Sequence, residues 1–215
     1  MGKVRVSSYG VSIDGYSAGP RQTLEHPLGE GGERMMEWFF PTRVFQQMYG
    51  DTPGETSVDN EIAERGMANV GAWILGRNMF GPIRGPWPDD SWKGWWGEDP
   101  PYHVPTFVLT HHPRPSITMK GGTVFHFVTD GIESALRQAK AAAGDKDVRI
   151  GGGAATIRQF LNVGAIDELH LAFGTALLGC GESIFDGTDL HGAGYECTER
   201  IVGERAVHLF LKRRA

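Results

Sequence analysis

Three glycines in succession are the strongest chemical signal in the sequence. Gly151-Gly152-Gly153 follow the strand-like segment Asp147–Ile150 and precede a helix-like segment. Glycine backbone lets a phosphate approach closely, and the free N–H groups at a helix N-terminus attract it. The pattern therefore predicts a phosphate-binding turn, with a tight strand-to-helix turn as the alternative. It is neither a P-loop, since no Gly-Lys-Ser/Thr follows, nor a G-x-G-x-x-G motif, since the sixth residue is Thr156.

Two other segments carry phosphate-compatible groups at the ends of apolar runs. Gly76-Arg77-Asn78 follows Val70–Leu75, and Thr110-His111-His112-Pro113-Arg114 ends the run that begins at Thr106. In an open α/β sheet, ligands bind outside the carboxyl ends of the strands. Each segment alone is compatible with an ordinary surface loop, but together with the glycine turn they predict a site for a phosphorylated ligand.

Other chemistries find little support in the sequence. His111 and His112 are adjacent rather than at metal-ligand spacing, and the two cysteines, Cys180 and Cys197, have no second cysteine beside them, so we expect no metal site. No G-x-S-x-G motif is present. With 21 Lys and Arg against 26 Asp and Glu, the net charge of −5 argues against a nucleic-acid partner. No apolar window is long enough to cross a membrane, and we expect a cytoplasmic protein.

The elements that would position these groups alternate between strands and helices. Strand-like runs occupy the following segments: 4–11, 70–75, 106–110, 123–128, 147–150 and 169–173. Amphipathic, helix-like segments lie at 57–69, 130–143 and 154–164, and residues 195–202 and 206–212 predict an antiparallel hairpin. This order predicts one α/β domain over residues 1–215, with a mostly parallel central sheet, flanking helices and a C-terminal antiparallel hairpin.

Local signals refine the boundaries of these elements. Ser57 is an expected helix N-cap, and Asp130 followed by Glu133 resembles a capping box. The Gly- and Pro-rich stretch 19–54 predicts a loop with a short helix, in which the apolar patch 35–40 is expected to pack in the interior. Residues 81–103 predict an irregular insert with four tryptophans, which either plug a core or dimer contact or form a stacking wall for a flat substrate.

Four of these segments together resemble the dihydrofolate reductase fold. The resemblance is to the branch that includes the reductase domain of the riboflavin-biosynthesis deaminase-reductase. The similar segments are Ser12–Gly19 after the first strand, Ile74–Arg77, Ile150–Gly153 and Phe160-Leu161. They occur in the order of the family over nearly the whole chain.

The resemblance implies that NADPH binds across the strand ends. It implies pyrophosphate contacts from the glycine turn and the start of the following helix, namely Gly151, Gly152, Gly153, Ala154, Ala155 and Thr156. Gly76, Arg77 and Asn78 match a second phosphate-contacting turn, Thr110 and His111 flank the adenosine ribose and its 2′-phosphate, and Ile13 and Gly15 border the nicotinamide.

Asp14 is the acidic residue whose matched position lies beside the reacting ring. It could assist proton transfer to the substrate, or Asp14-Gly15 could simply form a turn. The acidic residue that dihydrofolate reductase places on its first helix has no clear counterpart, and Glu37 is the nearby candidate.

We therefore expect an NADPH-dependent reductase that transfers a hydride to a small C=N or C=O substrate. The nearest reaction is that of the 5-amino-6-(5-phosphoribosylamino)uracil reductase of riboflavin biosynthesis. Alternatives are a dihydrofolate or pteridine reductase and a nucleotide-binding protein without turnover. The dimeric relatives of this fold imply a homodimer.

Overall fold

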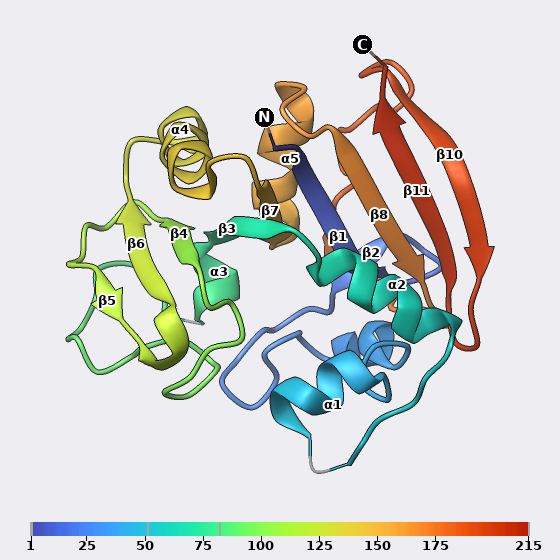
Figure 1. The fold of residues 1–215 in the computed structure, drawn as a ribbon, viewed down its shortest axis with the longest axis horizontal. Helices are drawn as coiled ribbons and strands as arrows, with labels where there is room; N and C mark the ends of the chain where they lie inside the picture. Colours follow the sequence, from blue (N-terminus) through green and yellow to red (C-terminus); the bar gives the residue numbers. More distant parts are fainter. Residues whose placement is uncertain (1, 51, 82, 215) are drawn as a thin grey trace.

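The protein is built around one twisted, mostly parallel sheet. The computed structural model describes residues 2–50, 52–81 and 83–214. The sheet has nine strands in the order β10-β11-β8-β1-β7-β3-β4-β6-β5, and β2 and β9 form a separate two-stranded ribbon. Figure 1 shows the sheet running from the red C-terminal hairpin at one end to the yellow-green strands β5 and β6 at the other.

The strands of the main sheet are β1 (Val4–Val11), β3 (Val70–Gly76), β4 (Pro105–Leu109), β5 (Ile117–Thr118), β6 (Val124–Val128), β7 (Asp147–Gly152), β8 (Glu168–Phe173), β10 (Tyr195–Val202) and β11 (Val207–Arg213). The ribbon strands are β2 (Tyr16–Ala18) and β9 (Glu182–Ser183). The α-helices are α1 (Arg43–Tyr49), α2 (Val58–Met67), α3 (Arg77–Phe80), α4 (Ile132–Ala143) and α5 (Ala154–Asn162), with 3-10 turns η1 (Gly32–Met36) and η2 (Lys120–Gly122).

Both faces of the sheet are covered, because alternate residues of its central strands are buried in different clusters. In β3, Ala72 and Ile74 pack in the cluster that contains the apolar faces of α4 and α5. Trp73 and Leu75 point the other way, into a second cluster built largely from aromatic side chains of the 81–104 insert and the neighbouring strands. A strand that is buried on both faces has a nearly continuous apolar sequence, and the sequence of Val70–Leu75 has this pattern.

The predicted fold class and most predicted elements are confirmed. The predicted strands at 4–11, 70–75, 106–110, 123–128, 147–150 and 169–173 appear as β1, β3, β4, β6, β7 and β8, and the C-terminal hairpin appears as β10 and β11. Ser57 is the N-cap of α2, where its Oγ accepts a hydrogen bond from the Asn60 N–H at 3.1 Å. In the insert, the described residues between α3 and β4 contain neither helix nor strand.

Two local predictions differ from the structure. The expected capping box at Asp130 is wrong, because α4 begins one residue later with Gly131 at the N-cap and without a side-chain cap. The Asp130 carboxylate instead accepts a hydrogen bond from the Ser134 hydroxyl at 3.1 Å. The 19–54 stretch contains two helical segments, η1 and α1, rather than one short helix, and Thr42 caps α1 by accepting from the Phe45 N–H at 3.2 Å.

None of the helices in the described part of the chain is both long and apolar enough to cross a membrane.

Candidate functional site

A large cavity opens along the carboxyl ends of the central strands. Its volume is about 720 Å³, which is in the range of sites that hold small organic ligands. The parallel register brings the strand ends together: Gly76 pairs with Leu109, and Leu75 pairs with Gly152. The three segments that the sequence singled out therefore meet at one edge of the sheet, as predicted for an open α/β sheet.

One part of the lining, here called the glycine lobe, consists of these strand-end segments. Its members are Gly76, Arg77, Asn78, Thr110, His111, His112 and residues 151–156. Helix α5 starts here with Gly153 as N-cap and with no side chain capping it. The first backbone N–H groups of the helix are thus left for water or a ligand. An ideal Cβ built on Gly153 meets no heavy atom within 4 Å, so the glycine leaves an open cradle beside the helix start.

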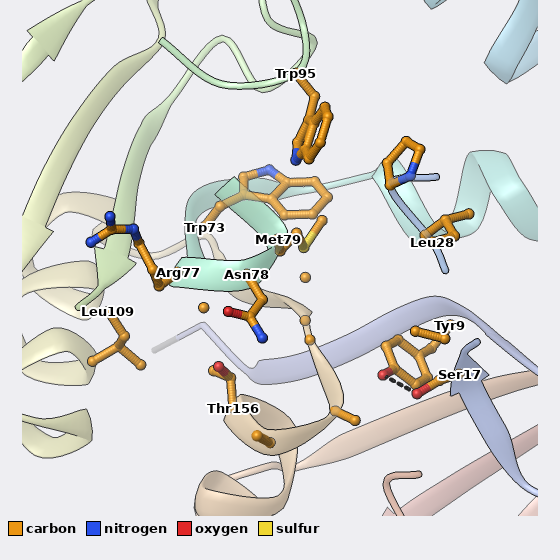
Figure 2. Close-up of a pocket in the computed structure, with 18 of the residues that line it drawn as sticks. Tyr9, Ser17, Leu28, Trp73, Arg77, Asn78, Met79, Trp95, Leu109 and Thr156 are labelled. Carbon is orange, nitrogen blue, oxygen red and sulfur yellow. Dashed lines mark hydrogen bonds between the residues drawn. The ribbon is translucent and has the colours of Figure 1, made fainter. Parts of the chain in front are cut away.

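Gly76 is required by a close approach between elements of the same lobe. A Cβ at this position would lie 2.2 Å from the Thr156 Oγ1. The absence of a side chain therefore allows the first turn of α5 to pack against the end of β3. Figure 2 shows Thr156 below Asn78 and Arg77 at this junction.

Arg77 supplies the main positive charge of the glycine lobe. Its guanidinium lies over the Trp87 ring, 3.1 Å from the ring centroid, while its Nη1 donates to the Thr110 Oγ1 at 3.0 Å and its Nη2 to the Gly85 carbonyl at 3.3 Å. Its Nε is buried without a hydrogen-bond partner, and among the described residues no carboxylate forms an ion pair with it. Burial, followed by repulsion from Arg84, lowers the Arg77 pKa to about 10, so the group remains charged at neutral pH. An unpaired, fixed guanidinium is suited to an anionic ligand.

Four residues that the sequence associated with the ligand do not line the cavity: Ile13, Asp14, Gly15 and Arg114. Arg114 is buried against the insert, and its guanidinium donates to the Trp92 and Asp90 carbonyl oxygens at 2.7 and 2.8 Å and pairs with the Asp90 carboxylate. Thr110 and His111, the two residues that the resemblance places beside the adenosine ribose and its 2′-phosphate, both line the cavity.

Asp14 has the contacts of a turn residue. Its carboxylate accepts hydrogen bonds from the Ser12 hydroxyl at 2.6 Å and from the Gly179 N–H at 2.6 Å. These two bonds, the Ser12 bond first, lower the pKa of the carboxyl group below its ordinary value. An ionised carboxylate outside the cavity lining, which joins its own turn to the distant Gly179 segment, fits a structural role better than proton transfer, and the catalytic role stays a prediction.

A second part of the lining, here called the aromatic lobe, was not predicted as a unit. It comprises Phe39, Phe45, Tyr49, Trp73, Trp96 and Tyr102. The rings contact one another edge to face, with centroids 4.8 Å apart for Trp73 and Tyr102 and 4.9 Å apart for Trp96 and Tyr102. These residues come from the segment after η1, from α1, from β3 and from the insert. The available signals were the apolar patch at 35–40 and the tryptophan cluster.

The structure divides the tryptophan cluster between the core and the cavity, and a stacking role toward a substrate stays a prediction. Trp87 and Trp92 pack against the second core cluster, whereas Trp95 and Trp96 line the cavity, and Trp96 also contacts that cluster. In the 35–40 patch, Met35 and Trp38 are buried in the interior as expected, but Met36 and Phe39 line the cavity.

Arg149 is a buried cation beside the aromatic lobe. Its guanidinium lies 4.3 Å from the centroid of the Trp73 ring. Its Nη1 donates to the Gly66 carbonyl at 3.0 Å and its Nη2 to the Ser7 carbonyl at 2.7 Å, while its Nε has no partner. Burial, with repulsion from Arg5 as a smaller cause, lowers the Arg149 pKa to about 9.

In the described parts of the chain, no group of three or more His, Cys, Asp or Glu side chains is arranged to hold a metal ion.

The comparison with protein families assigns nearly the whole chain. The model described as the RibD C-terminal domain matches residues 4–205. Among curated proteins, no significant match to the chain was found.

Solved structures share the fold at low sequence identity. A protein from Shewanella sp. PV-4, provisionally assigned to riboflavin biosynthesis, has 20% identity and a TM-score of 0.58, with 99% of this chain and 98% of that chain covered. Dihydrofolate reductase from Enterococcus faecalis, complexed with NADP(H), has 14% identity and a TM-score of 0.52, with 99% and 97% covered. The Thermotoga maritima diaminohydroxyphosphoribosylaminopyrimidine deaminase/5-amino-6-(5-phosphoribosylamino)uracil reductase has 11% identity and a TM-score of 0.55, and this chain spans 57% of its length.

Proposed function

We propose that this chain, which belongs to the RibD C-terminal domain family, is an NADPH-dependent reductase that transfers a hydride to a small C=N or C=O substrate. The observation that carries the proposal is the convergence of the glycine turn, the start of α5 and the unpaired Arg77 on one wall of the cavity. The reductase part of the proposal is supported by the family and by the fold shared with reductases.

The residues present fit a dinucleotide phosphate. Gly153 leaves an open cradle beside an uncapped helix start, and such a site holds a pyrophosphate through backbone N–H groups and the positive end of the helix dipole. Arg77 and His111, from the ends of the neighbouring strands, would meet a further phosphate such as the ribose 2′-phosphate. When bound, the dihydronicotinamide supplies the hydride.

The contribution of the protein is mainly to position the reactants and to exclude water. The glycine lobe would hold the phosphates, and Tyr9 of β1 borders this lobe, since a Cβ at Gly152 would lie 3.5 Å from the Tyr9 ring. The adjacent aromatic lobe would receive the acceptor and keep water from the reacting atoms. Holding two reactants in a productive orientation removes much of the entropic barrier of a bimolecular reaction.

The nearest known reaction is that of the aminouracil reductase of riboflavin biosynthesis, since the family and the Thermotoga maritima relative point to it. A dihydrofolate or pteridine reductase is the alternative from the same fold. Glu37, the candidate for the acidic residue of dihydrofolate reductase, is exposed and does not line the cavity, which favours the first over the second. We also propose a homodimer, which the native mass measured by light scattering tests directly.

NADPH oxidation tests the proposed function. The purified chain is incubated with NADPH and, in separate reactions, with the ribosylamino-uracil phosphate, with dihydrofolate and with a panel of aldehydes and ketones, and the absorbance of NADPH is followed. Oxidation that depends on one acceptor supports a reductase. Binding of NADPH without oxidation by any acceptor would instead support the nucleotide-binding protein without turnover.

A further inference from the structure

The aromatic lobe differs in its chemistry from a site for a phosphorylated sugar. Besides Arg149, the cationic and histidine residues that line the described cavity are Arg77, Arg84, His111 and His112. Repulsion from Arg84 contributes to the lowered pKa of Arg77, so these two charges are neighbours. In Figure 2, the Arg77 side chain lies on the opposite side of the cavity from Leu28. The groups that could bind phosphate are therefore in the glycine lobe, together with the neighbouring Arg84, and the proposed function already uses Arg77 and His111.

The remaining cation cannot replace such a cluster. The Nη atoms of Arg149 donate hydrogen bonds to the Gly66 and Ser7 carbonyl oxygens, and its Nε is buried away from solvent. A phosphate needs several convergent donors to replace its water, and a single buried guanidinium with its terminal nitrogens engaged does not provide them. A phosphorylated substrate would thus lose hydration in the aromatic lobe without regaining its hydrogen bonds.

The aromatic lobe also lacks the acid that a protonated ring system would need. Glu182 is the single carboxylate among the described residues that line the cavity, and it is an exposed residue of β9 whose backbone carbonyl accepts from Ser17. A pterin with a protonated ring nitrogen, or another cationic heterocycle, would meet the positive field of Arg149 without a compensating negative charge. That arrangement is unfavourable in a site largely walled by aromatic rings.

The aromatic lobe provides ring surfaces for stacking and the positive charge of Arg149. Phe39 and Phe45 lie with ring centroids 5.5 Å apart, and Phe45 and Tyr49 with centroids 5.4 Å apart. Trp73, Trp96 and Tyr102 supply the second aromatic group. Flat apolar rings gain most from such surroundings. The buried charge of Arg149 favours an electron-rich oxygen over an ammonium group, and favours it more as negative charge develops on that oxygen.

We propose that the aromatic lobe takes a planar aromatic carbonyl compound without a phosphate group as the hydride acceptor. This inference rests on the proposed function and names its substrate class. In the reaction, the hydride from C4 of NADPH forms a bond to the carbonyl carbon, the C=O π bond breaks, and the oxygen takes a proton from water. The products are the alcohol and NADP⁺, so the aldehyde or ketone is reduced and the dinucleotide is oxidised.

Binding of matched naphthalene compounds tests the inference without the cofactor. The chain without NADPH is titrated with 2-naphthaldehyde, 2-naphthyl phosphate and 2-naphthylmethylammonium, and quenching of tryptophan emission gives each dissociation constant. We expect saturable binding of the aldehyde, with the phosphate and the ammonium each at least about tenfold weaker. Equal or tighter binding of the phosphate, or no saturable binding of the aldehyde, would overturn the proposal.

A pair of phenylalanine variants locates the binding. Phe45→Leu removes one half-buried ring of the aromatic lobe, whereas Phe185→Leu removes a half-buried ring that packs outside the cavity. The aldehyde should bind about 2- to 12-fold more weakly to the first variant, which corresponds to the loss of one aromatic contact, and with unchanged affinity to the second. The same loss in both variants would contradict a site in the aromatic lobe.

Turnover and cofactor binding separate the two proposals. 2-Naphthaldehyde should support oxidation of NADPH, and 2-naphthyl phosphate should not. Saturable aldehyde binding without oxidation, in a chain that does bind NADPH, would overturn the acceptor assignment while leaving the reductase proposal in place. A chain that binds the aldehyde but not NADPH would instead refute the proposed function.

Discussion

Replacing Gly153 by alanine separates the phosphate contacts of the glycine turn from its part in the fold. Gly153 has φ −77°, which any residue adopts, and a Cβ at this position meets no protein atom within 4 Å. The fold should therefore accept the methyl group. Gly152 is a poorer choice, because its φ of 136° strains any other residue whether or not a phosphate binds.

The expected loss of affinity follows from the hydrogen bonds at risk. The methyl group of Gly153→Ala would occupy the cradle beside the start of α5 and hold a phosphate away from the backbone N–H groups. One hydrogen bond to a charged group contributes about 1.5–3 kcal/mol. Losing one such bond raises the dissociation constant for NADPH by roughly 10- to 150-fold, at about 1.4 kcal/mol for each factor of ten.

The assay is a titration with NADPH, followed by tryptophan quenching and by the rise of dihydronicotinamide emission. Gly174→Ala is the matched control, because a Cβ there lies 3.8 Å from its nearest contact and the residue does not line the cavity. Thermal unfolding shows that both variants are folded. An unchanged NADPH affinity in folded Gly153→Ala would refute the phosphate role of this turn.

Three further results are expected. If Arg77 and His111 meet a 2′-phosphate, NADPH binds more tightly than NADH. This difference in affinity becomes smaller as the salt concentration rises, and it is also smaller in Arg77→Met. Equal affinities for the two cofactors in the unmodified chain would remove both residues from the site. Asp14→Asn should lower the unfolding temperature by a few degrees while turnover persists, because the carboxylate accepts hydrogen bonds from the Ser12 hydroxyl and from the distant Gly179 N–H. A loss of turnover on the order of a hundredfold at unchanged NADPH affinity would restore the catalytic role. Burial first, and then the charge of His208, hold the pKa of His170 well below its usual 6.5. Below that pH the unfolded chain therefore binds more protons than the folded chain, and the unfolding free energy falls as pH drops from about 7 to 5. His170→Asn should flatten this fall, by at most about 1.4 kcal/mol per pH unit, in urea titrations; an unchanged slope would mean that another group causes it.

The sequence was sufficient to predict the sheet and the segments at its carboxyl edge. Strands such as Val70–Gly76 are buried on both faces, and the resulting run of apolar residues is visible without a structure. The position of the glycine turn between a strand and a helix likewise predicted that it would lie at a strand end. The pairing of β3 with β7 then brings Leu75 and Gly152 side by side, which makes one site of two separate signals.

Elements fixed by distant contacts were not predictable. The ribbon of β2 and β9 has strands of three and two residues whose pairing joins Tyr16 to Ser183, so neither strand has a recognisable pattern of its own. Helix α1 lies in a Gly- and Pro-rich stretch, where Thr42 is its one clear start signal.

The aromatic lobe was missed for the same reason. Its rings come from segments that are far apart in the chain, and each ring separately is also what a buried core requires. The sequence likewise identifies Arg149 only as a residue of a strand. Its burial over the Trp73 ring could not be predicted, because it depends on the register between β7 and β3.

The central claim is that the cavity holds NADPH with its phosphates at the glycine lobe, and isothermal titration of the folded chain with NADPH tests it most directly. We predict saturable binding to one site per chain that weakens in Gly153→Ala and persists in Gly174→Ala. No binding of NADPH at concentrations up to about 1 mM, which corresponds to a binding free energy weaker than about −4 kcal/mol, would contradict the account.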